Sequence, residues 1–518
     1  MIDKKEYYLR RYTKARVTTD LWIALLEACY HYTCPSRNLY YWTSQYQGAQ
    51  KNAKVYDTTA VAGLRTFVSK VHSALTPPQQ NWALFESTNF VPPEHRDELN
   101  AKLQEAAEVF FYYLHNSNFD VVINECYYDL GIGTACLIIN DGPSDDEPVI
   151  FFSVPLARLA PEQSYTGLLD SCWRWWDEVK ISDIQALWPK AKLTPLMETL
   201  VENDPGATVK LLVDGCIDRS PFNNKTKYTY VVLHEGEILL EEPVDRNAYL
   251  VYRWSRISNE VMGRGPVLEA LPTILTLQEL MRLELTSANL NVSKPIMAYS
   301  DGVFNPWTFK LEPNTIIPIA PNSQGQFPLQ PFPDTANPQF MQLTSNDLRM
   351  QINKLMYAEP LGGLEGTAKT ALEISYRKQE FLEQIGPSFT RLQQEFLPRL
   401  VDNVMHILQK RGLMPKIEVG GKEIKIRYKS PITISQGQAD VSVVTQWIQL
   451  MQGIYGGEVA STYLHPIEFP YWMADKMGVE QKILNTKEGM QQMMAQQSEA
   501  QQELEIAGIE QATEGMAA

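Results

Sequence analysis

The sequence predicts an elongated α+β protein that is mainly helical. Apolar residues recur at helical spacing through most of the first 130 residues and again over residues 435–485. Residues 132–255 instead contain short apolar runs separated by turn residues, which is typical of β-strands. Two long helical segments then flank a proline-rich insertion at residues 294–338. One helix therefore leads outward and another returns, which fits an elongated subunit better than a globular enzyme.

Length, charge and composition narrow the class of protein. A chain of 518 residues is too long for one hydrophobic core and predicts several domains. The net charge of -15 argues against a protein that binds nucleic acid tightly through a broadly basic face, although it does not exclude a protein that lets DNA pass without sticking. The N-terminus has no apolar signal-peptide stretch, and no 18-residue window is both apolar and uncharged, so we expect a soluble protein.

The sequence contains no catalytic, metal or cofactor motif that we recognise. The six cysteines form no C-x-x-C pair, so we expect reduced cytosolic thiols. The seven histidines are scattered without H-x-x-x-H, no G-x-S-x-G occurs, and the acidic turn "SDDEP" lacks the alternating ligands of a calcium loop. We therefore predict a protein that is not an enzyme and that uses no cofactor.

Turn and capping signals place the elements of the first half. "DTTAVAGLRTFVSKVHSAL" begins at Asp57, a good N-cap, and "PEHRDELNAKLQEAAEVFFYYLHN" begins with a proline followed by acids. "TACLIIN" and "VIFFSV" flank the turn-rich "DGPSDDEP" and predict a hairpin, and "HEGE" is the turn of a second one in "YTYVVLHEGEILLEE". The tryptophans of "CWRWWDE" could stack on bases, but a packed β face is favoured; they are Trp173, Trp175 and Trp176.

Long helices dominate the second half. From Gly265 a helix of about 28 residues would extend roughly 42 Å, with Pro272 kinking or separating its first turns. Nine of the 32 prolines lie in residues 294–338, where "PIMAY" and "NTIIPI" are strand candidates of a small subdomain. "QFMQLTSNDLRMQINKLMYAE" forms the returning helix, and a third helix runs to about Lys410 with a kink at Gly386-Pro387. A pair of strands at 416–430, the helical stretch and a marginally helical tail from 486 follow.

"GLEGTAKT", residues 363–370, differs by one residue from the phosphate-binding pattern G-x-x-x-x-G-K-[ST]. Ala368 replaces the second glycine, and the preceding "RMQINKLMYAEPL" is amphipathic and helical, whereas a P-loop follows a strand. Thr370 and Glu373 form a capping box, so the segment is better explained as a glycine-rich loop between two helices. The loop positions that this reading singles out are Gly362, Gly363, Gly366 and Lys369.

Three segments in order resemble one protein family, the head-to-tail connecting (portal) proteins of short-tailed, podovirus-type bacteriophages. Residues 55–86 match a V-Y-D-[ST] helix followed by L-T-P-P and a tryptophan, and residues 263–298 match a G-x-G-P helix start. Residues 370–415 match T-A-T-E-[IV]-x-x-R, L-G-P, R-L-Q-x-E and a final G-x-x-P, except that Leu372 and Ile385 depart from the first two patterns. The resemblance covers nearly the whole chain.

This resemblance implies a ring, usually of twelve copies, at one capsid vertex of the virion, with assembly in the host cytoplasm. Double-stranded DNA would pass through its channel during packaging and ejection. The terminase large subunit and then a tail adaptor protein would dock on the ring, and major capsid and scaffold proteins would assemble around it. The implied divisions are a wing (1–262), first stem helix (263–293), clip (294–338), second stem helix (339–358), tunnel loop (359–369), long kinked helix and strands returning to the wing (370–430), crown (431–485) and C-terminal tail or barrel helix (486–518).

The resemblance also implies contact residues. The tunnel loop facing DNA would comprise Leu361, Gly362, Gly363, Leu364, Glu365, Gly366, Thr367 and Lys369. Lys354 and Lys369 are candidate basic residues of the channel. The alternative for each is an ordinary solvent-exposed lysine without a special role. Contacts of the clip with the motor or adaptor would involve aromatic residues, namely Phe304, Trp307, Phe327 and Phe332.

Two alternatives stay open at this point. An ATP-driven packaging motor would use a degenerate P-loop at 363–370 and would hydrolyse ATP. A monomeric binding module would engage partners through its proline-rich arm. Ring formation without ATP hydrolysis distinguishes the portal reading from both.

Overall fold

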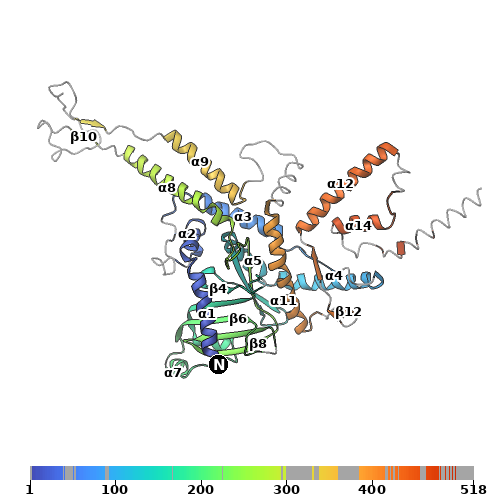
Figure 1. The fold of residues 1–518 in the computed structure, drawn as a ribbon, viewed down its shortest axis with the longest axis horizontal. Helices are drawn as coiled ribbons and strands as arrows, with labels where there is room; N and C mark the ends of the chain where they lie inside the picture. The colour runs from blue at the N-terminus through green and yellow to red at the C-terminus, as the bar shows by residue number, and fades with distance from the viewer. Residues whose placement is uncertain are drawn as a thin grey trace, which may run out of the picture.

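The computed structural model confirms a mainly helical protein with small sheets (Figure 1). In the part of the chain that it describes, no helix is long and apolar enough to cross a membrane. The residues described are 3–38, 40, 51, 54–87, 93–165, 167–223, 226–292, 296–298, 329–331, 338–359, 384–414, 418–419, 422–423, 426–429, 431–455, 463–477 and isolated positions beyond.

Helices fill the first part of the chain, as predicted. The helix expected from Asp57 begins at Thr59, and the "PEHRDELN" helix has the predicted bounds. One strand, β1 (Leu84–Ser87), interrupts the helices and pairs with β14 (Ile426–Lys429) near the other end of the chain. The helices are α1 (Lys4–Asp20), α2 (Ile23–Thr33), the 3-10 turn η1 (Pro35–Arg37), α3 (Thr59–Leu75), α4 (Pro93–Asn116) and α5 (Phe119–Ile132).

Two antiparallel sheets follow, and both predicted hairpins are present. The smaller sheet has the order β3-β2-β9 and the larger β4-β5-β6-β7-β8. Two short helices, α6 (Ile181–Leu187) and α7 (Pro195–Asn203), lie in the stretch that we expected to be mostly β. The strands are β2 (Thr134–Asp141), β3 (Val149–Ser153), β4 (Leu159–Glu162), β5 (Ser171–Lys180), β6 (Thr208–Asp218), β7 (Tyr228–His234), β8 (Glu237–Val244) and β9 (Tyr249–Arg253), with the 3-10 turn η2 (Leu156–Arg158) between β3 and β4.

Helix α1 covers one face of the larger sheet. Tyr8 and Tyr12 of α1 are buried in one apolar cluster with Trp173 and Trp175 of β5. The rings of Tyr12 and Trp173 meet edge to face with centroids 6.0 Å apart, and Trp176 packs into the cluster on the other side. Trp173 and Trp175 are therefore core residues and Trp176 is partly buried, which favours the packed-face interpretation over base stacking.

An arm of two helices projects from the body (Figure 1). Helix α8 (Pro266–Val292) leads outward and α9 (Pro338–Leu355) returns beside it, while β10 (Ile296–Ala298) and β11 (Leu329–Pro331) pair beyond their ends. Helix α8 runs unbroken through Pro272, so its first turns are not a separate helix. The strand expected in "PIMAY" is confirmed, whereas "NTIIPI" lies outside the described residues.

The C-terminal part departs from expectation in two places. Gly386 and Pro387 lie within a helical stretch over 384–395, and the break occurs at Phe396, just before α11 (Leu397–Lys410). Pro398 explains this break because it has no N–H for the helical ladder. Instead of one strand pair at 416–430, β12 (Glu418–Val419) and β13 (Lys422–Glu423) pair together while β14 pairs with β1. The predicted helical stretch contains α12 (Pro431–Tyr455) and α14 (Glu468–Met477).

One large core joins the body to the base of the arm. It contains residues of α2 to α5, the smaller sheet and α11, and also Val267, Ile274 and Leu277 of α8. Beyond Leu277 the apolar side chains of α8 emerge, since Leu283 and Leu285 are exposed. The first half of α8 is thus packed in the core of the body, whereas apolar side chains of the second half are exposed to solvent.

Candidate functional site

The structure describes one of the predicted site residues and its surroundings. Lys354 lies exposed in the last turn of α9. The other predicted residues lie outside the described residues; these are Leu361, Gly362, Gly363, Leu364, Glu365, Gly366, Thr367 and Lys369 of the loop, and Phe304, Trp307, Phe327 and Phe332 of the insertion. The site can therefore be built from the arm, its base and the point where the chain leaves α9.

Helix α9 ends in a Schellman motif with an unusual residue at its centre. The Ala358 N–H donates to the Asn353 carbonyl (2.7 Å), and the Tyr357 N–H donates to the Lys354 carbonyl (3.1 Å). Tyr357 occupies the left-handed position, with φ of 53°, where glycine is the usual residue. A non-glycine residue there costs roughly 1 kcal/mol, which its side-chain contacts must offset.

Contacts around Tyr357 fix the direction in which the chain leaves the arm. Its ring lies 6.5 Å from that of Phe67 and 6.2 Å from that of Trp254, centroid to centroid. Lys70 Nζ donates to the carbonyl oxygens of Tyr357 (2.9 Å) and Glu359 (2.7 Å). These contacts hold the end of α9 against α3.

The geometry before that stretch is wrong for nucleotide binding. A P-loop needs a buried strand that delivers the glycines beneath the phosphates. Residues Pro338–Leu355 are a helix, and Met356 to Ala358 form its capping turn. The predicted helical lead-in is thus confirmed, and the near match to the P-loop pattern has no structural support.

A polar joint holds both arm helices to the start of α3. Gln278 of α8 accepts the backbone N–H groups of Tyr56 (2.8 Å) and Asp57 (3.1 Å), and its amide donates to the Asp57 carbonyl (2.6 Å). Thr58, not Asp57 as predicted, is the N-cap residue of α3, but Asp57 Oδ1 accepts the N–H of Thr59, the first residue of the helix, at 2.8 Å. Asp57 Oδ2 accepts from Arg349 Nε of α9 at 2.9 Å. The V-Y-D-T segment therefore caps one helix and ties down two others.

Two glycines let the backbone before α8 pack directly against the backbone at the end of α5. A Cβ atom on Gly263 would overlap the carbonyl oxygen of Gly133, and one on Gly265 would overlap that of Gly131. The Gly265 N–H donates to the Ile132 carbonyl at 2.8 Å. The G-x-G-P pattern is thus required because two backbones touch where α5 ends and α8 starts.

A buried ion pair joins the smaller sheet to the helix before α11. Arg253 of β9 is fully buried, and its Nη2 lies 2.8 Å from Glu395 Oε1. The Arg253 backbone N–H and Nε both donate to Glu395 Oε2. Arg391 Nη1 reaches the same carboxylate at 3.3 Å. The first and last residues of the R-L-Q-x-E motif therefore meet at this pair.

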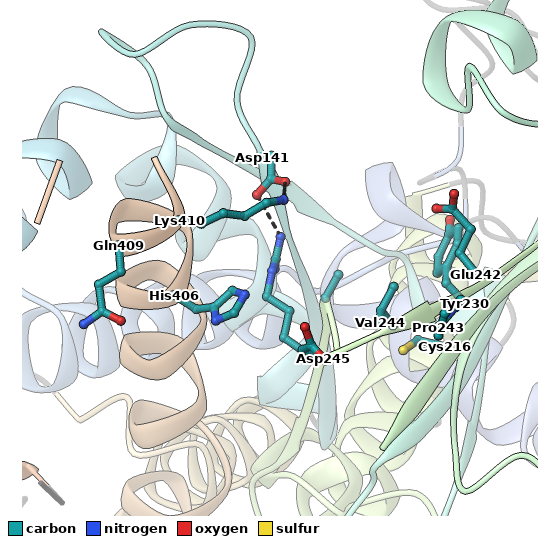
Figure 2. A pocket seen from close by; sticks show the side chains of 12 residues that line it. Asp141, Cys216, Tyr230, Glu242, Pro243, Val244, Asp245, His406, Gln409 and Lys410 are labelled. Atoms are coloured by element: carbon teal, nitrogen blue, oxygen red, sulfur yellow. Dashed lines mark hydrogen bonds and ion pairs between the residues drawn. The ribbon is translucent and has the colours of Figure 1, made fainter. Parts of the chain in front are cut away.

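A cleft of about 720 Å³ lies between β2, the end of β8 and α11 (Figure 2). Asp141 faces Lys410 (3.2 Å) and Arg246 (3.1 Å) across it. Burial would raise the pKa of Asp141, but Arg246 and Lys410 together hold it below its ordinary value. Burial raises the pKa of Cys216 to about 12, so this thiol is not an activated nucleophile. The cleft joins elements through ion pairs and contains no nucleophile with an adjacent base.

All six cysteines are unpaired, as expected for reduced thiols. Within the described residues, no group of three or more histidine, cysteine or acidic side chains could hold a metal ion. The features that the structure does define here are the hydrogen-bonded and ion-paired contacts around the base of the arm. Sequence reasoning noticed the motifs but missed the partners Gln278, Arg349 and Arg253, for which it offered no local signal.

Comparisons with known proteins agree with this arrangement of motifs. Residues 5–484 match the family described as bacteriophage head to tail connecting protein. The chain is 19% identical over 536 residues to a "Probable portal protein" of Bordetella phage BPP-1, covering 98% of this chain and 93% of that protein. It is 23% identical over 479 residues to a "Portal protein" of Salmonella phage epsilon15, covering 84% and 78%. The chain thus belongs to the bacteriophage head-to-tail connecting protein family, as its three motifs predicted.

Proposed function

We propose that the chain forms a ring of twelve copies at one vertex of the capsid. Double-stranded DNA passes through the channel of this ring during packaging and ejection. The ring docks the terminase large subunit and later the tail adaptor protein, and it nucleates assembly of the major capsid and scaffold proteins in the host cytoplasm. It has no chemistry of its own, since ATP hydrolysis belongs to the terminase. Membership of the connector family and two relatives named portal proteins support this proposal.

The observation that carries the proposal is the two-helix arm. Helices α8 and α9 pack along each other and leave the body together (Figure 1). Apolar side chains remain exposed on both helices, including Leu283 and Leu285 of α8 and Leu343 and Met350 of α9. Exposed apolar residues along a projecting helix pair favour burial against further helices. Copies of the same arm arranged around an axis would provide them and would enclose a channel.

On this proposal each segment has a part in the ring. The wing is 1–262, the stem helices are 263–293 and 339–358, and the clip between them at 294–338 meets the motor and adaptor. The tunnel loop is 359–369, the chain returns to the wing over 370–430, and the crown is 431–485 with a tail or barrel helix beyond. The end of α9 supports this division, because its capping turn and the hydrogen bonds from Lys70 hold residues 357–359 against α3, immediately before the loop.

Charge supports a channel that does not retain DNA. The chain carries a net charge of -15, so phosphates meet few attractive sites as they slide past. Lys354 is exposed where α9 ends, close in sequence to the loop. We assign Lys354 and Lys369 to weak contacts with the DNA backbone, with Phe304, Trp307, Phe327 and Phe332 of the clip contacting the motor or adaptor.

Mass photometry and negative-stain images of the purified protein test the proposal. The expected result is a species near twelve times the 59.0 kDa chain, seen as rings with a central hole. An ATPase assay on the same sample should give no activity above a blank. A 59 kDa species that hydrolyses ATP would contradict the proposal and favour a packaging motor.

A further inference from the structure

Helix α12 carries an exposed apolar stripe. Val443, Trp447, Leu450 and Ile454 are 64%, 42%, 62% and 61% exposed. Their spacing of four, three and four residues repeats the pattern of a helix–helix seam. At 3.6 residues per turn the four side chains fall within a sector of about 60°. Four large apolar side chains aligned in this way form a contact surface, unlike apolar residues scattered singly.

The same helix uses a different seam against its own chain. Val441 is buried, and Val444, Ile448 and Met451 are half-buried. Helix α14 packs along α12 and contributes the buried Ala474 (Figure 1). The centres of the two seams lie about 110° apart around the helix. Helix α12 therefore has an inner seam against its own chain, where α14 is the main neighbour and α3 and β14 also touch the helix, and an outer stripe that the described part of the chain leaves exposed.

Charge indicates what covers the outer stripe. Residues 431–455 contain one charged side chain, Asp440, which pairs with Lys476 of α14 at 2.7 Å. Two copies of a chain with net charge -15 repel each other in general, but they can approach at a neutral, apolar face. The same neutrality gives the stripe no attraction for DNA phosphates. A second copy of this chain is the occupant that these properties favour.

We propose that the stripe formed by Val443, Trp447, Leu450 and Ile454 packs against the α12–α14 layer of the adjacent copy. This inference rests on the proposed ring and names a subunit contact within it. A ring contact is head to tail, so the stripe meets a different surface of its neighbour, and every copy repeats the contact. Trp447 lies in the middle of the stripe and is the anchor, because central aromatic residues carry most of the binding energy at such surfaces.

The test compares Leu450→Glu with Gln449→Glu by mass photometry across a range of protein concentrations. Gln449 is exposed and points away from both seams, so its variant adds the same charge without touching the stripe. We expect Leu450→Glu to raise the concentration for half-assembly at least about tenfold, and Gln449→Glu to assemble like the wild type. Trp447→Ala, which adds no charge, should act in the same direction.

The outcomes separate this inference from the proposed function. The circular dichroism spectra should be unchanged, because the substituted side chains are exposed and their loss does not alter the fold of the subunit. Rings of normal stability from Leu450→Glu and Trp447→Ala would overturn the stripe contact and leave the ring intact. Equal weakening by Leu450→Glu and Gln449→Glu, with no effect of Trp447→Ala, would also overturn it. A wild-type protein that stays monomeric at every concentration would overturn both.

Discussion

The buried Arg253–Glu395 pair gives the most demanding prediction about stability. Glu395→Ala leaves the guanidinium of a fully buried arginine without its carboxylate. Arg253 keeps the carbonyl oxygens of Gly167 (2.7 Å) and Val261 (3.3 Å), which accept hydrogen bonds but do not neutralise the charge. Breaking one side of such a pair costs about 3–5 kcal/mol of unfolding free energy. Glu395→Gln should cost less, about 2–3 kcal/mol, because its amide oxygen still accepts hydrogen bonds.

Urea unfolding followed by tryptophan fluorescence measures these losses. The chain has 11 tryptophans, so their summed emission follows global unfolding, to which the buried Trp254 next to Arg253 contributes. The double variant Arg253→Met/Glu395→Leu removes both charges together, and it should recover at least about 1 kcal/mol relative to Glu395→Ala. A Glu395→Ala protein within 1 kcal/mol of the wild type, or a double variant less stable than Glu395→Ala, would refute the reasoning.

Three further predictions concern other joints and one half-buried histidine. Gly265→Ala forces a Cβ against backbone and should cost about 2–3 kcal/mol in urea unfolding, whereas Gly386→Ala, with open space around it, should not destabilise the protein. Asp57→Ala should cost about 2 kcal/mol, since it removes the hydrogen bond to the Thr59 N–H and a salt bridge, and it should be non-additive with Arg349→Ala; additive losses would show that the two side chains do not interact. Burial lowers the pKa of His72 below 6.5, so the neutral ring is favoured in the folded state. Stability should therefore fall as the pH drops through 6.5 towards the folded pKa, and thermal midpoints of His72→Gln between pH 7 and pH 5 should fall less than those of the wild type; equal falls would contradict this assignment.

The sequence predicted correctly those helices and strands that are determined by residues within the same segment. The arm helices follow from apolar spacing and a proline at the first helical position, and the hairpins follow from their turn residues. Helix α7 was missed although its signal was present, because Thr194 caps it and Pro195 follows directly. The C-terminal end of α9 could not be predicted, because the left-handed position there is occupied by Tyr357 and not by the glycine or asparagine that usually marks the end of a helix.

Long-range partners could not be predicted from one sequence. Asp57 was interpreted as a helix cap, which accounts for one carboxylate oxygen, but the other binds Arg349, 292 residues away along the chain. Strand β1 was not expected because its partner β14 lies near the opposite end of the protein. Glu395 belonged to a recognised motif without an assigned role until the fold brought it to Arg253. Such pairings arise from tertiary packing, which local propensity and spacing do not encode.

An electron cryo-microscopy map of the assembled particle tests the central claim most directly. The account predicts a closed ring in which α8 and α9 of every copy lie side by side around the central hole. The end of α9 at Tyr357 should then face the channel, with the following loop directed inward. A ring whose arms point outward into solvent, or an assembly without a central hole, would contradict the account.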